Sequence, residues 1–360
     1  MKLTKRKILV VAAIIFAVVV GLAIFNILRH IIYWTPTEQV SFPSNGVQLS
    51  GILIKPKEEG IYPAVVMLHG SGPESSNDLA YRVNANALVR RGFAVLIYDK
   101  RGVGNSGGDF ESASFSDFVD DGIAAVNYLC GRADIANDRI GLFGTSEGAW
   151  FTPEIAARSG AVAFIFNRVG PPFSWTENVI WEVRNDFLHD GITEQDVDAL
   201  VAITQRRWDF YVAVSNDPTL ANGEQRASID AELRRLRETV PNADKVLPER
   251  LRDYDEEWYS DFAAEAQYDP RPFLEAIDVP MYYVYGETDI NVPTKKAVAY
   301  LEKLREEHGK KIEIHVYPGV GHPMFTWKGI FNAGYPPGYL ELMSTWSAEQ
   351  VSQSGKGGEK

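Results

Sequence analysis

Short apolar runs alternate with helix-like segments along most of this chain, and this alternation constrains the fold more than any other feature. The runs "PAVVMLHG" and "RIGLFG" each end in glycine, as buried strands often do. Helical periodicity follows over 77–91 and 147–158. Strands that alternate with helices form a mostly parallel sheet covered by helices on both faces. We therefore expect an α/β fold with a doubly wound sheet.

The alternation stops in the middle of the chain and then resumes. Residues 171–269 are polar and aromatic-rich, with helical patterns and no convincing strand. After them "VPMYYVYG" reads as a strand, followed by another helix and another strand. The predicted organisation is an N-terminal anchor (1–34), a catalytic core (35–170 and 270–350), a helical cap inserted between the two core segments (171–269) and a disordered tail (351–360).

The N-terminal region contains one long apolar run, from Ile8 to Leu28. Its 21 residues would span roughly 30 Å as a helix, enough to cross the hydrocarbon core of a bilayer. Basic residues precede this run, which predicts a cytoplasmic N-terminus and an extracytoplasmic (periplasmic or extracellular) catalytic domain. We expect an uncleaved transmembrane helix; a cleaved signal peptide is the alternative, although its apolar core is usually shorter. The basic residues are Lys2, Lys5, Arg6 and Lys7.

The charge and the cysteine content exclude other classes of protein. The chain has 360 residues and a net charge of −12, with no Lys/Arg cluster after its first seven residues, so nucleic-acid binding is not expected. Its one cysteine, Cys130, cannot form an internal disulfide, and no Cys/His cluster has zinc spacing. We therefore expect no metal site.

A G-x-S-x-G motif lies between a predicted strand and a predicted helix. Gly144, Ser146 and Gly148 form it, and the strand–helix context is the one that this motif requires. A tight turn of this kind strains the backbone of the central residue and exposes its side chain above a helix N-terminus. Ser146 is therefore the candidate nucleophile.

A serine nucleophile needs a base and an orienting acid, and both are available in loops after predicted strands. His322 lies in the glycine-bounded loop of "YPGVGHPMF", and Asp289 lies in "VYGETDINVP". Glu287 is a rival for the acid. The chain order Ser146, Asp289, His322 is the α/β-hydrolase order, unlike the orders of chymotrypsin and subtilisin.

These motifs together resemble the α/β-hydrolase superfamily of serine hydrolases, in its esterase-like and serine-aminopeptidase-like branch. The resemblance covers roughly 42–167 and 268–327. It implies that the N–H groups of Ser71 and Glu147 form an oxyanion hole, that His69 is a supporting residue, and that no cofactor or metal is needed. The segments that carry it are "HGSGP", "YDKRGVGNSGG", "GTSEG", "GETDINVP" and "GVGH", in this order.

One motif suggests a different class of protein. Gly102, Gly104 and Gly107 spell G-x-G-x-x-G after a predicted strand, the fingerprint of dinucleotide binding. A dinucleotide loop leads directly from strand into helix, whereas here three residues precede the first glycine and no helix begins until about Ser114. We therefore expect a loop near the active-site edge rather than a nicotinamide site.

The sequence thus predicts a membrane-anchored serine hydrolase that cleaves carboxylic esters through a Ser-His-Asp triad and an acyl-enzyme. Its expected partners are a small-molecule acyl substrate and the membrane. Peptidase or aminopeptidase activity, and thioesterase or acyltransferase activity, remain open because the same triad serves all of them. A non-catalytic binding protein on the same fold is the remaining alternative. The insertion is expected to form a lid over Ser146.

Overall fold

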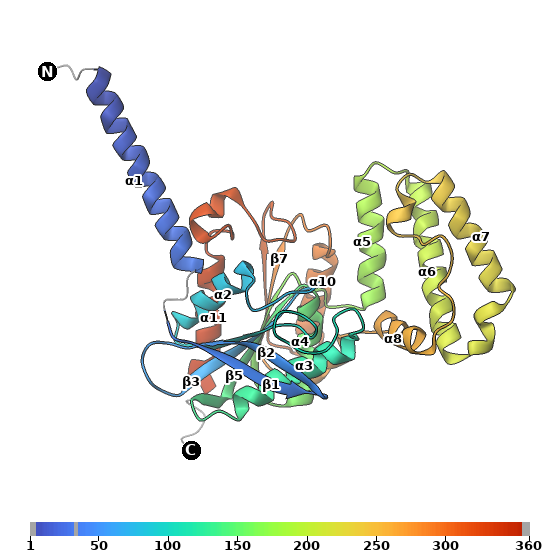
Figure 1. The fold of residues 1–360 in the computed structure, drawn as a ribbon, viewed down its shortest axis with the longest axis horizontal. Helices are drawn as coiled ribbons and strands as arrows, with labels where there is room; N and C mark the ends of the chain where they lie inside the picture. The colour runs from blue at the N-terminus through green and yellow to red at the C-terminus, as the bar shows by residue number, and fades with distance from the viewer. Residues whose placement is uncertain (1–4, 32–34, 355–360) are drawn as a thin grey trace.

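The computed structural model describes residues 5–31 and 35–354 and contains an eight-stranded sheet in the order β1-β2-β4-β3-β5-β6-β7-β8 (Figure 1). Strand β2 pairs antiparallel with β1 and β4, and all other neighbours are parallel. The fold predicted from the alternation is therefore confirmed. The strands are β1 Thr37–Ser44, β2 Val47–Ile54, β3 Tyr62–Leu68, β4 Ala94–Tyr98, β5 Ile135–Thr145, β6 Val162–Arg168, β7 Met281–Gly286 and β8 Ile312–Tyr317.

Helices bury both faces of the sheet, which explains why its central strands are continuously apolar. All five residues of β4 and all six of β7 are buried. One apolar cluster joins the sheet to α3, α4 and α10, and a second joins its other face to α2 and α11. These helices are α2 Leu79–Val89, α3 Phe115–Cys130, α4 Glu147–Ser159, α10 Thr294–His308 and α11 Tyr339–Ser354, and the short α9 Arg271–Ala276 and η3 Trp327–Asn332 complete the core segments.

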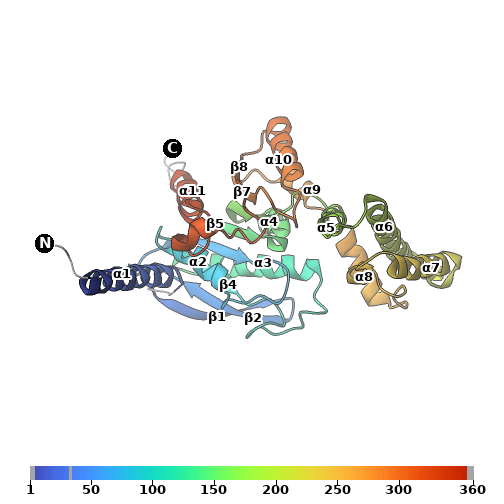
Figure 2. The ribbon, with the colours of Figure 1, turned by 90° about the horizontal axis from the view of Figure 1, so that it is seen from above.

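Residues between β6 and α9 form helices that pack around their own apolar cluster. They lie at the opposite end of the molecule from α1, as Figures 1 and 2 show. Helix α8 begins at Glu256, because Asp255 caps it by accepting a hydrogen bond from Trp258 N–H. The elements are α5 Trp175–His189, α6 Glu194–Asn216, η1 Pro218–Asn222, α7 Glu224–Thr239, η2 Ala243–Lys245 and α8 Glu256–Ala266.

The ends of the chain differ from the expected anchor and tail. Helix α1, Lys5–Ile31, projects from the core (Figure 1). Among the residues that the structure describes, no helix combines the length and the apolar character that crossing a membrane requires, so the prediction of a transmembrane helix over 8–28 is corrected. The C-terminal end of α1 packs on the core instead, where the buried His30 accepts a hydrogen bond at its carbonyl from Asn86 Nδ2 (2.6 Å).

Helix α11 continues to Ser354, into the segment predicted as a disordered tail. Residues 1–4, 32–34 and 355–360, which belong to the predicted anchor and tail, lie outside the described residues. The division of the chain into a core and a cap stays a prediction.

Candidate active site

Ser146 lies in the tight turn between β5 and α4. Its φ of +50° and ψ of −116° are strained for a residue with a side chain. The flanking glycines permit this turn: a Cβ on Gly148 would lie 2.4 Å from the carbonyl oxygen of His69, and one on Gly144 would lie 2.6 Å from Ala149 Cα. Both contacts are far closer than carbon atoms tolerate, so the motif's two glycines are required sterically.

Three side chains that are distant in the sequence meet above this turn. His322 Nε2 lies 3.0 Å from Ser146 Oγ. On the other side of the ring, His322 Nδ1 lies 3.0 and 2.9 Å from the two carboxylate oxygens of Asp289. A hydrogen on Nδ1, donated to Asp289, leaves Nε2 as an acceptor for the serine hydroxyl. Transfer of a proton from hydroxyl to imidazole requires this geometry.

The Asp289 side chain is fully buried, and the His322 side chain is 21% exposed. Asp289 Oδ1 also accepts hydrogen bonds from the backbone N–H groups of Asn291 (2.8 Å) and Val292 (2.9 Å). These contacts fix the carboxylate that orients the imidazole. The rival acid, Glu287, faces elsewhere and accepts a hydrogen bond from Gly319 N–H (2.9 Å).

The predicted oxyanion donors lie on two segments that flank Ser146. Glu147 is the first residue of α4, so its N–H has no acceptor within that helix. The loop after β3 approaches from the other side: a Cβ on Gly70 would lie 3.6 Å from Ser146 Cβ. Among the described residues, the Ser71 N–H that follows has no hydrogen-bond acceptor. Both amides therefore stay candidates for the oxyanion hole.

His69 is not a base in this site. Its ring is buried, Nε2 contacts the carbonyl oxygen of Tyr98, and burial lowers its pKa to about 4. The ring is thus neutral at pH 7, and its 3.9 Å approach to Glu74 is not an ion pair there. Its buried position at the start of the loop after β3 agrees with a supporting role.

The glycine-rich segment after β4 folds into a closed loop rather than leading into a helix. Gly102 N–H donates to the carbonyl of Gly107 (2.8 Å), and the next helix, α3, begins only at Phe115. Asp99 accepts from Ser76 N–H (2.8 Å) and from Asn105 N–H (2.9 Å), which ties this loop to the one after β3. The glycines thus shape part of the active-site edge.

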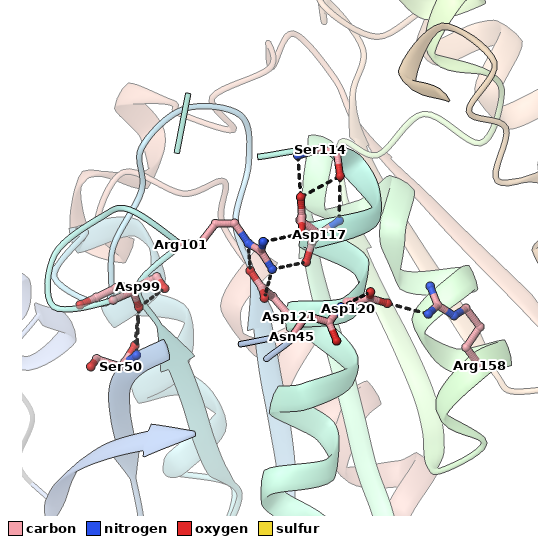
Figure 3. Close-up of polar contacts among 10 residues, drawn as sticks. Asn45, Ser50, Asp99, Arg101, Ser114, Asp117, Asp120, Asp121 and Arg158 are labelled. Carbon is pink, nitrogen blue, oxygen red and sulfur yellow. Dashed lines mark hydrogen bonds and ion pairs between the residues drawn. The ribbon is translucent and has the colours of Figure 1, made fainter. Parts of the chain in front are cut away.

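Arg101 fixes the same loop to α3, as Figure 3 shows. Its guanidinium donates to both oxygens of the buried Asp121 (2.9 and 2.7 Å) and to Asp117. Asp117 in turn forms the capping box of α3 with Ser114. This network was not predicted, although its residues lie in and just after the quoted motif.

Carboxylates of the inserted helices approach the site from outside the core. Glu182 of α5 accepts a hydrogen bond from Asn291 Nδ2. Burial, followed by Asp186 and Asp289, raises its pKa, and His322 acts in the opposite direction. Glu265 of α8 has a pKa raised to about 7 by burial and by Glu147 and Asp261. Sequence reasoning missed both glutamates because no motif covers these helices.

The comparisons with known proteins identify relatives of this chain. The chain is 25% identical over 300 residues to esterase EstD of Thermotoga maritima, covering 81% of this chain and 61% of EstD, so it spans about three fifths of that relative. It is 26% identical to a non-heme haloperoxidase of Rhodococcus erythropolis over 72% of this chain and 86% of that one. Est1E of Butyrivibrio proteoclasticus, solved with ferulic acid bound, shares the fold with a TM-score of 0.54, 17% identity and coverage of 88% and 99%.

The sequence pattern of the X-Pro dipeptidyl-peptidase (S15) family matches residues 45–321, which include Ser146 and Asp289 and end one residue before His322. The match extends from the β1–β2 turn to the loop after β8 and includes the inserted helices. The chain therefore belongs to the X-Pro dipeptidyl-peptidase (S15) family and is a serine hydrolase of the α/β-hydrolase superfamily.

Proposed function

We propose that the chain hydrolyses carboxylic esters through an acyl-enzyme formed on Ser146. The observation that carries this proposal is the alignment of hydroxyl, imidazole and buried carboxylate at a helix N-terminus, with 3.0 Å between Ser146 Oγ and His322 Nε2. The relative named as an esterase supports an ester substrate.

In the proposed reaction Ser146 Oγ attacks the ester carbonyl while His322 Nε2 takes its proton. Asp289 holds the ring and stabilises the imidazolium. The N–H groups of Ser71 and Glu147 donate to the oxyanion of the tetrahedral intermediate. When the C–O bond breaks, His322 returns the proton to the leaving alcohol. Water then attacks the acyl-enzyme by the reverse sequence and releases the carboxylic acid.

The test is the Ser146→Ala variant, assayed with p-nitrophenyl acetate and with a fluorophosphonate probe. We expect both turnover and labelling to disappear, because no other hydroxyl in the described residues has this imidazole contact. Ser352→Ala, at the exposed end of α11, is the matched control and should behave as the parent protein. Labelling that survives in Ser146→Ala would refute this nucleophile.

Peptide hydrolysis is the second candidate, favoured by the family to which the chain belongs and by one structural feature. Glu182 places a carboxylate within electrostatic range of His322 and Asp289, where it could pair with a substrate amine. A screen of esters, thioesters and peptide amides, with free and blocked amines, separates the candidates. A preference for free amines that Glu182→Gln abolishes would favour the peptidase.

We propose further that the inserted helices limit access to Ser146. Helix α5 contacts the loop of the acid: Asn178 Nδ2 donates to the carbonyl of Asn291 (3.1 Å), and Asn185 Nδ2 donates to that of Ile290 (3.3 Å). Removing both contacts in an Asn178→Ala/Asn185→Ala variant should increase turnover of long-chain esters relative to p-nitrophenyl acetate. An unchanged ratio would argue against the lid.

An extracytoplasmic location stays a proposal that rests on the sequence alone: basic residues precede the apolar run of 8–28, as they do in a secretory signal peptide. A C-terminal alkaline phosphatase fusion tests it, because this reporter is active only outside the cytoplasm. An inactive fusion that is nevertheless expressed would contradict the proposal.

A further inference from the structure

We propose that Lys100 is a positioning residue that polarises the peptide group between Gly70 and Ser71 and so strengthens one donor of the oxyanion hole. This inference rests on the function proposed above. It gives a role to the "DKRG" part of the glycine-rich segment, which the catalytic residues leave unexplained.

The geometry of Lys100 singles out that peptide group. Its Nζ donates to the carbonyl oxygen of Gly70 (2.7 Å) and to Glu147 Oε1 (2.8 Å). The carbonyl of Gly70 and the N–H of Ser71 belong to one planar, conjugated unit. Lys100 therefore contacts the rear of the first predicted oxyanion donor, and its second partner is the side chain of the residue that bears the other donor.

The environment makes this contact strong. The side chains of Lys100 and Glu147 are 5% and 14% exposed, so water screens the ammonium little. The ammonium also lies 4.5 Å from the ring centroid of Phe118 and 5.3 Å from that of Phe110. A buried cation on a carbonyl oxygen withdraws electron density through the amide, and this makes the N–H a better donor.

The loop that carries this peptide is also fixed by contacts that do not involve the ammonium. Gly70 N–H donates to the hydroxyl of Tyr81 (2.9 Å), and Lys100 N–H donates to the carbonyl of Glu74 (3.2 Å). The loop after β3 is therefore held in place without the ammonium contact. Lys100 thus contributes charge and direction at one carbonyl, where the effect on a developing oxyanion is greatest.

Two simpler roles must be separated from this one. Lys100 could serve only to neutralise Glu147, or only to stabilise the fold. If Lys100 only neutralises Glu147, removing both charges would restore activity. If it only stabilises the fold, the loss of kcat in each variant would parallel the loss of thermal stability. Neither role predicts a selective weakening of oxyanion binding.

The test compares Lys100→Met, which keeps the length of the side chain without its charge, with the parent protein. The control is Lys303→Met, an exposed lysine of α10 whose partner is Glu307. We expect kcat for p-nitrophenyl acetate to fall about tenfold or more in Lys100→Met, with KM within about twofold, because only the transition state carries the oxyanion. Affinity for a boronic acid, which forms a tetrahedral adduct on Ser146, should fall by a similar factor.

Two further variants complete the test. Lys100→Gln keeps a donor for the Gly70 carbonyl without the charge and should recover part of the lost kcat. The Lys100→Met/Glu147→Gln double variant should remain as slow as Lys100→Met. Recovery in the double variant would overturn the proposal in favour of simple neutralisation.

Thermal unfolding of each variant identifies a structural cause. Equal losses of kcat and of boronic acid affinity at an unchanged melting temperature support the proposal. An unchanged kcat in Lys100→Met overturns the proposal. A loss of kcat that disappears when each protein is assayed at the same number of degrees below its own melting temperature also overturns it. If Ser146→Ala keeps its activity, the proposed function itself has failed. Because that result comes from Ser146→Ala and not from the Lys100 variants, the two failures can be distinguished.

Discussion

The sheet edge and the inserted helices treat buried charge differently. Two cations at the sheet edge meet carboxylates: Lys100 pairs with Glu147, and Arg101 pairs with Asp121. In the insertion, Arg207 instead donates to a backbone carbonyl, that of Val246 (3.1 Å), and has no carboxylate partner among the described residues, whereas Arg226 pairs with Asp230 and Asp253.

The pKa values reflect this contrast. Burial lowers the pKa of Arg101, yet Asp121 and Asp117 outweigh burial and raise it. Burial alone dominates at Arg207, whose pKa is lowered. Lys100 and Arg101 thus form ion pairs beside the reacting groups, whereas Arg207 fastens irregular backbone of the insertion. We infer that the pairs of Lys100 and Arg101 serve the reaction and that Arg207 serves the packing of the insertion.

The largest expected effect comes from the acid at the sheet edge. Asp289→Asn keeps the size of the side chain but presents an amide N–H to His322 Nδ1, which favours the wrong imidazole tautomer. We expect kcat to fall about 10⁴-fold. Glu287→Gln is the matched control, two residues away and outside the network, and should change kcat less than about threefold. Steady-state assays with p-nitrophenyl acetate measure both.

If Glu287→Gln were the slower variant, the acid of the site would be misassigned. Circular dichroism and thermal unfolding of both variants separate such a result from loss of the fold.

The parts of this edge that the sequence predicts are those specified locally. The G-x-S-x-G turn needs only a strand, two glycines and a helix start, and all of these can be read within ten residues. Asp289 and His322 follow because parallel strands bring their carboxyl ends to one edge, where α/β enzymes place their sites. The alternation of apolar runs with helical segments likewise predicts a parallel sheet, although it does not predict the order of the strands.

What the sequence does not predict depends on packing between distant segments. The Lys100–Glu147 pair joins residues 47 positions apart, and nothing in either motif indicates it. Glu182 and Glu265 approach the site only because α5 and α8 pack against the core. Helix α1 illustrates the opposite error, since an apolar run alone predicted a membrane span, which no helix in the described part of the chain provides.

A pair of matched substitutions tests the comparison of buried charges directly. Arg101→Met leaves the fully buried Asp121 without its partner, which should lower the free energy of unfolding by ~3–5 kcal/mol. Arg207→Met removes one hydrogen bond to a carbonyl and the burial of a cation, so the loss should be only ~1 kcal/mol or less. Urea unfolding measures both variants.

Equal losses of the free energy of unfolding in Arg101→Met and Arg207→Met would remove the distinction between the two regions. A larger loss in Arg207→Met would mean that the insertion, rather than the sheet edge, depends on buried charge for its stability.

The smallest expected effect lies where the two regions meet. Glu265 of α8 has a pKa of about 7, raised first by burial and then by Glu147 and Asp261. In the unfolded chain this carboxyl titrates near 4.5, so between pH 4.5 and 7 the folded protein holds the extra proton. The free energy of unfolding therefore falls as pH rises through this window.

Glu265→Gln, which is neutral at every pH, should remove that fall. We expect its melting temperature to match the parent protein near pH 5 and to exceed it by about 2 °C at pH 8. The exposed Glu238→Gln on α7 is the control and should show no such pH dependence. A difference in melting temperature between Glu265→Gln and the parent that is constant from pH 5 to 8 would contradict the assignment.

Because Glu147 is the second cause of the raised pKa of Glu265, the gain in melting temperature at pH 8 should shrink when Glu265→Gln is made in a Glu147→Gln background. A shrunken gain would show that the two regions are electrostatically coupled through this pair of glutamates.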